Sequence, residues 1–578
     1  MAPTDQLQEV KIMLHGTAAS EGIGIGKVML IEEHSLEYTP RTVTDTEAES
    51  QRFKAAVDAF CYNTEKQAEN LRSSAGEKEA EILAGHIQII KDPYLSGEIE
   101  KLIADGQCAE SALEHMCDMF IAMFSAADDE LTKQRAADVR DIKSGVLGIL
   151  LGVNEIKVSD APKGTVLVAR ELTPSVTAGI VKENITGIIT ETGGTTSHSA
   201  ILARALEIPA VLSVEGVASS LKNGDTVVVD GSEGAVIVNP DDNTVAEYSK
   251  KRDAFLAERK ELENYRGRET KSASGEAYEL FCNIGKPEDA VKAVDADGEG
   301  VGLFRTEFLF MDRTSIPTED EQFEAYKKAA LILKGKSLII RTLDIGGDKD
   351  IPYLGLEKEE NPFMGFRAIR YCLKNRELFK SQIKAILRAS AFGDIKIMFP
   401  LITTMDELRE GKKLVAECKA DLRNMDINFN ENIQVGVMVE TASAAVIADM
   451  LAKEADFFSI GTNDLTGYTM ACDRGNNDVS YLYSPLQPSV LRMIKRTIEC
   501  GVQNGISVGM CGEAAANKLM IPLLISFGLT EFSVSAPSVL NVRKIISTWT
   551  KEEADKVTAK VLEMSTQQEI VEYLKSVV

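Results

Sequence analysis

No histidine occurs after residue 198 of this 578-residue chain. The histidines lie at positions 15, 34, 86, 115 and 198. Histidine is the side chain that most readily serves as a base or a nucleophile near neutral pH. Any histidine chemistry in the long C-terminal part of the chain must therefore be supplied by the N-terminal part.

The sequence also has no long hydrophobic run. No apolar stretch approaches the roughly 20 residues of a membrane-spanning helix. Residues 1–16 lack the charged start and the apolar core of a signal peptide. These absences predict a cytosolic protein with no membrane insertion.

Basic charge and closely spaced cysteines are scarce as well. The net charge of -25 excludes a nucleic-acid-binding protein, because no basic surface is available to neutralise phosphates. The nine cysteines have no Cys-x-x-Cys spacing, so neither a disulfide framework nor a zinc site is expected. The remaining composition, 44% hydrophobic and 26% charged, is that of a globular protein too long for a single core.

The N-terminal part contains two kinds of sequence pattern. Strand-like, glycine-rich segments predict one α/β domain made of residues 1–33 and 152–240. Residues 34–151 between them are rich in Ala, Glu, Lys and Leu, which predicts an all-helical insertion. Residues 31–150 contain 24 acidic and 12 basic side chains. This excess is typical of a solvated face, and it would also suit a docking surface for a basic protein.

The rest of the chain predicts a linker and a barrel. Residues 241–270 read as an exposed linker helix, since their body from Thr244 to Glu263 has no Gly, Pro or Asn. Residues 271–578 alternate apolar strands with amphipathic helices, as in a closed (β/α)₈ barrel. The expected strands are 278–284, 300–305, 337–344, 395–401, 433–440, 456–461, 506–511 and 531–535. An open Rossmann sheet would need a glycine-rich phosphate turn after its first strand, and none is present.

His198 is expected in the first turn of a helix. An apolar, β-like segment (185–189) precedes it, and apolar residues with helical spacing (201–206) follow. The segment 193–197, Gly-Gly-Thr-Thr-Ser, allows a close approach to the backbone and supplies capping hydroxyls and free amides. Such a helix start stabilises an anion, including a phosphoryl group on His198. On this stretch alone, a capped helix with a solvent-facing histidine is an equal alternative.

Polar groups of complementary kinds follow the predicted barrel strands. They are Arg305 and Glu307, Arg341, Asp344 and Asp348, Glu440, Asn463 and Asp464, and Cys511 and Glu513. The carboxyl ends of barrel strands form the active site in this architecture. Arginines suit phosphate, carboxylates suit a hard divalent cation, and a thiol can move a proton. Solvated rims also carry charge, but this combination favours a small phosphorylated anion bound with Mg²⁺.

With these strand ends the chain resembles a known family over essentially its full length. The matching segments are 302–312, 341–349, 361–370, 458–465 and 510–513. They are similar to signatures of Enzyme I of the sugar phosphotransferase system, the phosphoenolpyruvate–protein phosphotransferases. The Thr-Ser-His-Ser segment around His198 is similar to the phosphohistidine motif of this family.

The resemblance implies an activity and a domain plan. Phosphoenolpyruvate would phosphorylate His198, pyruvate would leave, and the phosphoryl group would pass to the histidine of the phosphocarrier protein HPr, as the first step of sugar uptake. Residues 1–33 and 152–240 would be a swivelling phosphohistidine domain, and residues 34–151 its HPr-binding insertion. Residues 271–578 would be a phosphoenolpyruvate-binding barrel that also forms a homodimer.

The resemblance also implies the role of each site residue. His198 would carry the phosphoryl group, and Glu440 and Asp464 would bind Mg²⁺. The substrate phosphate would be bound by Arg305, Arg341 and Arg474, and Asn463 and Asp464 would lie at the substrate. Arg367 would steady the phosphoryl group in transfer, and Cys511 would protonate the enolate carbon. The chain departs from the family pattern at Phe366, Ala442, Gly467, Gln487, Ala516 and Asn517. None of these departures removes an assigned residue.

Two alternative families compete with this interpretation. Pyruvate phosphate dikinases and phosphoenolpyruvate synthases resemble the chain in the phosphohistidine domain and the barrel, but they phosphorylate their histidine from ATP. They need a large nucleotide-binding domain, and the residues before His198 contain no glycine-rich phosphate loop. A non-catalytic regulatory relative would keep the fold without the intact motif residues found here.

Overall fold

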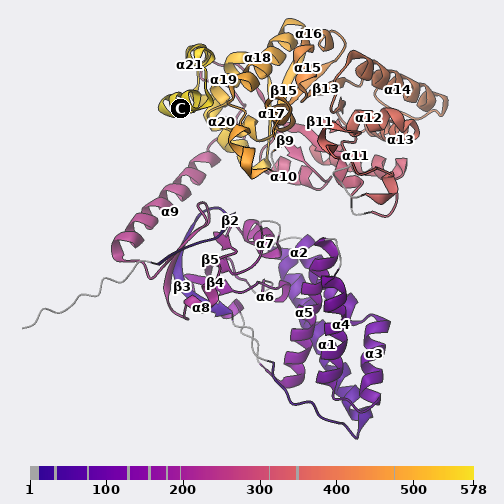
Figure 1. Ribbon diagram of the computed structural model, residues 1–578, viewed down its shortest axis with the longest axis vertical. Helices are drawn as coiled ribbons and strands as arrows, with labels where there is room; N and C mark the ends of the chain where they lie inside the picture. Colours follow the sequence, from indigo (N-terminus) through magenta and orange to yellow (C-terminus); the bar gives the residue numbers. More distant parts are fainter. Residues whose placement is uncertain are drawn as a thin grey trace, which may run out of the picture. The chain divides into compact units, whose positions relative to one another are not determined.

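The computed structural model of this protein describes residues 12–31, 36–74, 77–126, 130–153, 158–177, 180–194, 197–311, 313–346, 351–473 and 476–578. The chain forms two compact units, Met1–Arg259 and Lys260–Val578, which are called the N-terminal unit and the barrel unit below (Figure 1). The prediction of a mixed α/β protein that ends in a barrel is confirmed. The finer division into four parts stays a prediction.

The N-terminal unit is built around an eight-stranded sheet. Its strands are β1 (Ile12–His15), β2 (Thr17–Ser20), β3 (Ile23–Ile31), β4 (Thr165–Ala169), β5 (Ile185–Thr190), β6 (Ala210–Leu212), β7 (Thr226–Asp230) and β8 (Ala235–Val238). Their order in the sheet is β1-β8-β7-β3-β4-β5-β6-β2. The strands from β3 to β6 run parallel. Short helix α6 (Pro174–Thr177) connects β4 to β5, α7 (His198–Leu206) connects β5 to β6, and α8 (Val217–Ser220) lies between β6 and β7.

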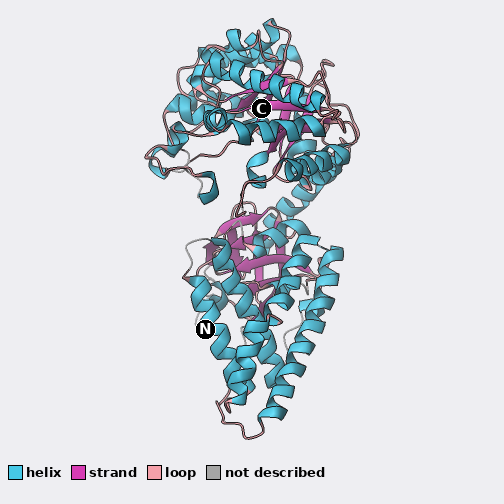
Figure 2. Ribbon diagram, turned by 90° about the vertical axis from the view of Figure 1, so that its right-hand side faces the viewer, coloured by secondary structure: helices cyan, strands magenta, loops and turns pink. Residues whose placement is uncertain are grey.

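Five helices interrupt this sheet between β3 and β4. They are α1 (Thr46–Ser74), α2 (Glu77–Ile90), α3 (Pro93–Ala104), α4 (Ala109–Ser125) and α5 (Glu130–Leu151). They have a hydrophobic core of their own that includes Phe53, Ile99 and Leu113. β3 and β4 pair side by side although the insertion separates them in sequence, so the sheet is continuous across it (Figure 2). Helix α9 (Asp242–Glu263) follows the sheet and contains the boundary between the two units.

The barrel unit contains all eight strands that the sequence predicted. They are β9 (Glu279–Ile284), β10 (Gly300–Arg305), β11 (Ser337–Arg341), β12 (Ile395–Phe399), β13 (Val435–Val439), β14 (Phe457–Gly461), β15 (Ser507–Cys511) and β16 (Glu531–Val534). All are parallel, and pairing of β16 with β9 closes the barrel. Its helices are α10 (Asp289–Asp295), α11 (Glu319–Leu333), α12 (Ala368–Lys374), α13 (Arg376–Ala389), α14 (Met405–Asn424), α15 (Ala442–Val446), α16 (Ala448–Leu451), α17 (Thr462–Met470), α18 (Pro488–Gln503), α19 (Ile521–Phe527), α20 (Val539–Thr548), α21 (Lys551–Glu563) and α22 (Gln567–Val577).

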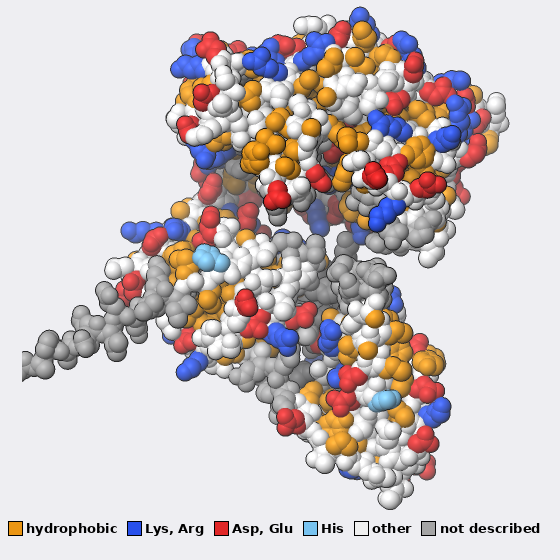
Figure 3. All heavy atoms as spheres, viewed as in Figure 1, with side chains coloured by type: hydrophobic (Ala, Val, Ile, Leu, Met, Phe, Trp, Pro, Cys, Tyr) orange, Lys and Arg blue, Asp and Glu red, His pale blue; other side chains and the backbone are white. Residues whose placement is uncertain are grey.

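Alternation along each strand separates the two faces of the barrel wall. A small buried cluster of Leu303, Ile339, Met398, Met438, Phe457 and Cys511 lies apart from the much larger cluster between the strands and the helices. Successive side chains of a strand point to opposite faces, so the small cluster fills the barrel interior. Charged side chains of both signs intermix on the face of the barrel unit shown in Figure 3. Among the described helices, none is long and apolar enough to span a membrane.

One buried arginine ties the end of the barrel to its beginning. Arg543, on α20, is 1% exposed. Its guanidinium donates to the carbonyl oxygen of Tyr265 at 3.0 Å and to the hydroxyl of Thr270 at 3.0 Å. It also pairs with the carboxylate of Asp297 and lies 3.5 Å from that of Glu299. Arg543 thereby joins the segment after α9, the loop before β10 and the last helices of the barrel.

We expect the substitution Arg543→Met to destabilise the barrel unit. The change leaves the carboxylates of Asp297 and Glu299 without their guanidinium partner and removes three further hydrogen bonds, to Thr270, Tyr265 and the carbonyl oxygen of Asp297. The free energy of unfolding should fall by about 3 kcal/mol. The single tryptophan, Trp549, lies in this unit, so urea unfolding followed by its fluorescence measures the loss.

Arg409→Met is the matched control. Arg409 makes a two-pronged ion pair with Glu454 on the exposed surface, where solvent screens the charges. Its loss should change the unfolding midpoint far less. Equal effects of the two substitutions would contradict the anchoring role of Arg543.

Candidate functional site

The carboxyl ends of the barrel strands gather the charged side chains that the sequence singled out. Arg305 ends β10, Arg341 ends β11, Glu440 directly follows β13 and Cys511 ends β15. Asp464 lies in the first turn of α17, which begins directly after β14. Parallel strands of a closed barrel end at the same rim, so residues far apart in sequence meet there.

Three carboxylates form a cluster at this rim. Asp344, Glu440 and Asp464 each offer an oxygen, and these oxygens lie within 4.8 Å of one another. Asp344 and Glu440 are 8% and 2% exposed. The sequence placed Asp344 at the end of the third strand but assigned only Glu440 and Asp464 as cation ligands. The same signal, a carboxylate after an apolar strand, could have identified Asp344.

Two arginines lie between these carboxylates. Arg341 pairs with Asp344 at 3.1 Å and also contacts the carboxylate of Glu307. Arg367 directly precedes α12 and pairs with Asp344 at 2.7 Å and with Asp464 at 3.8 Å. Positive and negative groups therefore alternate along the rim, as buried charges require.

Both guanidiniums keep unused hydrogen-bond donors. Nε of Arg341 and Nη1 of Arg367 are buried and have no hydrogen-bond partner among the described residues. The half-buried Arg305 forms no side-chain hydrogen bond or ion pair with another described residue. Buried donors of this kind are costly unless they are satisfied, so they indicate a site for an anion with several oxygens.

The electrostatics of the cluster favour a cation at its centre. Burial raises the pKa of Glu440 well above its usual value, and the nearby Asp464 and Asp344 raise it further. Burial opposes the charge of Arg341, but Glu307 and Asp344 outweigh that effect, and the net result is a raised pKa. A hard divalent cation bound by carboxylate oxygens would relieve the repulsion among the three acids. The donor set therefore fits Mg²⁺.

Backbone contacts hold Glu440 in place. The amide of Leu401 donates to its Oε1 at 2.7 Å. A Cβ atom at Gly461 would lie 2.7 Å from its Oε2, which is too close for any side chain. The position of the Glu440 carboxylate therefore requires glycine at position 461, at the end of β14.

Cys511 is a buried thiol beside the charged groups. It is 3% exposed, and burial raises its pKa to about 11. Its sulfur donates to the carbonyl oxygen of Ile460 at 3.7 Å. The side chain is thus a protonated thiol near neutral pH, as a proton donor requires.

Two further residues of the predicted site, Asn463 and His198, lie at the starts of helices. Asn463 lies in the first turn of α17, and its carbonyl oxygen accepts from the hydroxyl of Tyr483 at 3.0 Å. His198 is the first residue of α7, directly after Ser197, whose hydroxyl accepts from the amide of Ala200 at 3.3 Å. The predicted helix start at His198 is present. The side chain of His198 lies outside the described part of the structure, as do Arg474 and Asp348.

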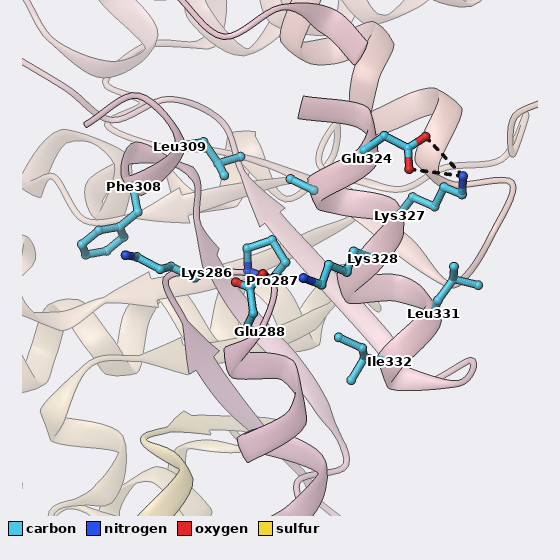
Figure 4. Close-up of a pocket in the computed structure, with 11 residues that line it drawn as sticks. Lys286, Pro287, Glu288, Phe308, Leu309, Glu324, Lys327, Lys328, Leu331 and Ile332 are labelled. Atoms are coloured by element: carbon cyan, nitrogen blue, oxygen red, sulfur yellow. Dashed lines mark hydrogen bonds and ion pairs between the residues drawn. The ribbon is translucent and has the colours of Figure 1, made fainter. Parts of the chain in front are cut away.

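A separate groove of about 910 Å³ lies between the segment 286–288 that precedes α10, helix α11 and the turn after β10 (Figure 4). Its lining includes Phe308, Leu331 and the ion pair of Lys327 with Glu324. None of the described site residues lines it, so the groove is not part of the cluster above.

Comparison with known proteins gives matches to all parts of the chain. The sequence pattern of the PEP-binding domain of PEP-utilising enzymes matches residues 259–550. Those of the N-terminal domain and the mobile domain of the same enzymes match residues 15–135 and 161–234.

Named relatives match the chain at nearly full length. A phosphoenolpyruvate-protein phosphotransferase of Bacillus subtilis is 46% identical over 570 residues, which cover 98% of this chain and 99% of the relative. One of Listeria innocua is 45% identical, covering 97% and 98%. Among solved structures, a solution structure of an Enzyme I protein is 37% identical and covers 42% of this chain and 99% of its own, with a TM-score of 0.38.

We expect Glu440→Gln to weaken the binding of a divalent cation at least about tenfold. The change removes one charged ligand from the cluster and keeps the shape of the side chain. Mn²⁺ prefers similar oxygen ligands and is paramagnetic, so titration followed by electron paramagnetic resonance measures the affinity.

Glu307→Gln is the control for this measurement. Glu307 is a buried carboxylate that pairs with Arg341, but it lies outside the carboxylate cluster. Its substitution should change the affinity for Mn²⁺ by less than about threefold. Equal losses in both variants would show that the cation does not bind at the cluster.

Proposed function

Because this chain belongs to the phosphoenolpyruvate–protein phosphotransferase family, we propose that it moves the phosphoryl group of phosphoenolpyruvate to its own His198 and then to the histidine of HPr. The full-length relatives are enzymes of this name, and the proposal places this chain at the first step of the sugar phosphotransferase system. One observation carries the proposal. The barrel unit has arginines, clustered carboxylates and a thiol at its strand ends but contains no histidine, so the phosphoryl acceptor comes from the N-terminal unit.

The barrel binds and polarises the substrate in this proposal. Arg305, Arg341 and Arg474 bind the phosphate, and Arg367 contacts the phosphoryl oxygens during transfer. Asn463 and Asp464 lie at the substrate. Phosphoryl transfer depends on positioning and on neutralising oxygen charge, and these side chains supply both.

The three clustered carboxylates would hold Mg²⁺. Asp344, Glu440 and Asp464 supply oxygen ligands of the kind that this ion prefers. When bound, the ion neutralises negative charge on the phosphate oxygens. Including Asp344 extends the ligand set inferred from the sequence.

The transfer itself requires neutral imidazole at His198. A nitrogen of the ring attacks phosphorus, the bond from phosphorus to the enol oxygen breaks, and enolpyruvate remains in the barrel. The free amides at the start of α7 stabilise the new negative charge. The thiol of Cys511 then donates its proton to the enolate carbon, and pyruvate forms.

The second transfer uses the helical insertion. We infer that HPr docks on α1 to α5, because residues 31–150 carry 24 acidic and 12 basic side chains and would attract a basic partner. His198 serves both transfers, so its domain swivels between the barrel and HPr. The homodimer through the barrel and the cytosolic location stay predictions of the sequence.

His198→Ala should abolish formation of the phosphoprotein. The substitution removes the nucleophile and leaves the cap formed by Ser197 and Ala200, so the fold should persist. Incubation with radiolabelled phosphoenolpyruvate and Mg²⁺, followed by a count of acid-labile label on protein, measures the effect. His115→Ala on the helical insertion should keep full labelling, and label in the His198 variant would refute the proposed acceptor.

Cys511→Ser should bind phosphoenolpyruvate but form pyruvate at least about 100-fold more slowly. The arginines and carboxylates stay in place, whereas a serine hydroxyl is a far weaker acid than a thiol. Pyruvate release is measured with HPr in excess. Cys500→Ser, which removes a buried thiol far from the rim on α18, should keep the normal rate, and normal turnover in both variants would show that the proton comes from another group.

A further inference from the structure

Two buried polar atoms lie inside the barrel without hydrogen-bond partners among the described residues. They are Oε1 of Glu531 and Oγ of Ser459, which lies near enough to the thiol of Cys511 to offset part of the rise that burial causes in its pKa. Glu531 is 5% exposed and Ser459 is 1% exposed. Unsatisfied polar atoms in a closely packed interior cost stability, so their presence requires an explanation.

Strand register places both residues beside Gly509, two positions before Cys511 on β15. Ser459 on β14 and Glu531 on β16 both pair with Gly509, which lies between them on β15. Gly509 and Cys511 are two residues apart and point to the same face of β15. The carboxyl and the hydroxyl therefore flank the position immediately beneath the proton donor.

Two glycines leave the space that the Glu531 carboxyl occupies. A Cβ atom at Gly509 would lie 2.8 Å from Oε1 of Glu531. One at Gly302 on β10 would lie even closer to that oxygen and 2.5 Å from the hydroxyl of Ser533. The carboxyl of Glu531 thus extends into the barrel interior, which is also the face of the sheet on which Cys511 lies.

Glu531 holds a proton near neutral pH. Burial and, to a smaller extent, the neighbouring carboxylate of Glu279 on β9 raise its pKa to about 8. Lys396 on β12 acts in the opposite direction and only partly offsets these effects. The barrel interior therefore contains a protonated carboxyl one layer below the thiol.

Cys511 needs such a neighbour in the proposed reaction. Each turnover consumes the proton of its thiol, and the resulting thiolate must regain one before the next substrate can be protonated. Cys511 is only 3% exposed. In the proposed reaction pyruvate covers its open side until it leaves. A proton supplied from the barrel interior avoids this obstruction.

We propose that Glu531 is the proton reservoir that restores the Cys511 thiol through the hydroxyl of Ser459. The inference rests on the proposed role of Cys511. In this step the O–H bond of the Glu531 carboxyl breaks, the Ser459 oxygen takes that proton and releases its own, and the S–H bond of Cys511 forms. Glu531 remains as a carboxylate and regains its proton from solvent. No hydrogen bond joins Glu531 to Ser459 among the described residues, so the step includes a side-chain rotation that brings the two oxygens together.

Glu531→Gln tests the proposal in a rapid-quench experiment. The amide keeps the size of the side chain but cannot donate an acidic proton. With phosphoenolpyruvate, Mg²⁺ and excess HPr, the variant should release its first pyruvate per site at the normal rate, since Cys511 starts protonated. Later turnovers should be at least about tenfold slower, giving a burst of one pyruvate per site.

The pH profile gives a readout that a merely structural role would not change. In the unaltered chain the steady-state rate should fall as pH rises through about 8, because Glu531 loses its proton. That fall should be absent in Glu531→Gln. In Glu279→Gln it should move to lower pH without any burst, since a charge that raises the pKa of Glu531 is gone.

Ser459→Ala keeps the proposal testable if Glu531→Gln fails to fold. It leaves the carboxyl in place, removes the intermediate hydroxyl and should show the same burst. Normal steady-state rates in both variants, while Cys511→Ser is slow, would overturn the reservoir and leave the proposed function standing. Normal turnover in Cys511→Ser would overturn the proposed role of the thiol itself. A burst in Glu279→Gln as large as in Glu531→Gln would also contradict the proposal.

Discussion

The charged groups at the barrel rim depend on one carboxylate, that of Asp344. It lies between two guanidiniums, with Arg341 at 3.1 Å and Arg367 at 2.7 Å, and it also belongs to the carboxylate cluster. A buried charge without a partner costs several kcal/mol, so the pairing of carboxylates with guanidiniums is what allows several charged groups in a buried site. The arginines are thereby held in position before a substrate arrives, and such preorganised charge is the main source of catalysis in phosphoryl transfer.

The same rim explains why the reaction is divided between two units. Guanidiniums and a divalent cation stabilise a phosphate but are not nucleophiles, and the barrel unit has no histidine. The proposed nucleophile, His198, begins a helix in the N-terminal unit, where the amides of α7 suit a phosphorylated side chain. In the proposed reaction the barrel has two tasks, which are charge neutralisation and protonation of carbon.

The proposed reprotonation of Cys511 depends on which side chains of β15 point into the barrel. The strand that ends in Cys511 has glycine at the preceding inward position, and that glycine leaves space for the carboxyl of Glu531. An apolar residue at position 531 would give a better packed interior, because a buried carboxyl with an unpaired oxygen opposes folding. A stability cost of this kind is typical of functional sites. Here the large hydrophobic core between the barrel strands and the helices, with its many fully buried side chains, offsets that cost.

Local patterns in the sequence determined the eight strands, the helix that starts at His198 and the position of each charged residue at a strand end. These features depend on side-chain periodicity and capping, which act over a few residues. Only the tertiary structure decided that Asp344 joins Glu440 and Asp464, since barrel closure sets which strand ends face one another. Glu531 shows the same limit. In the sequence it is a polar residue at the start of a strand, whereas register across β14, β15 and β16 places it beneath Cys511, because pairing between distant strands is not encoded by any local pattern.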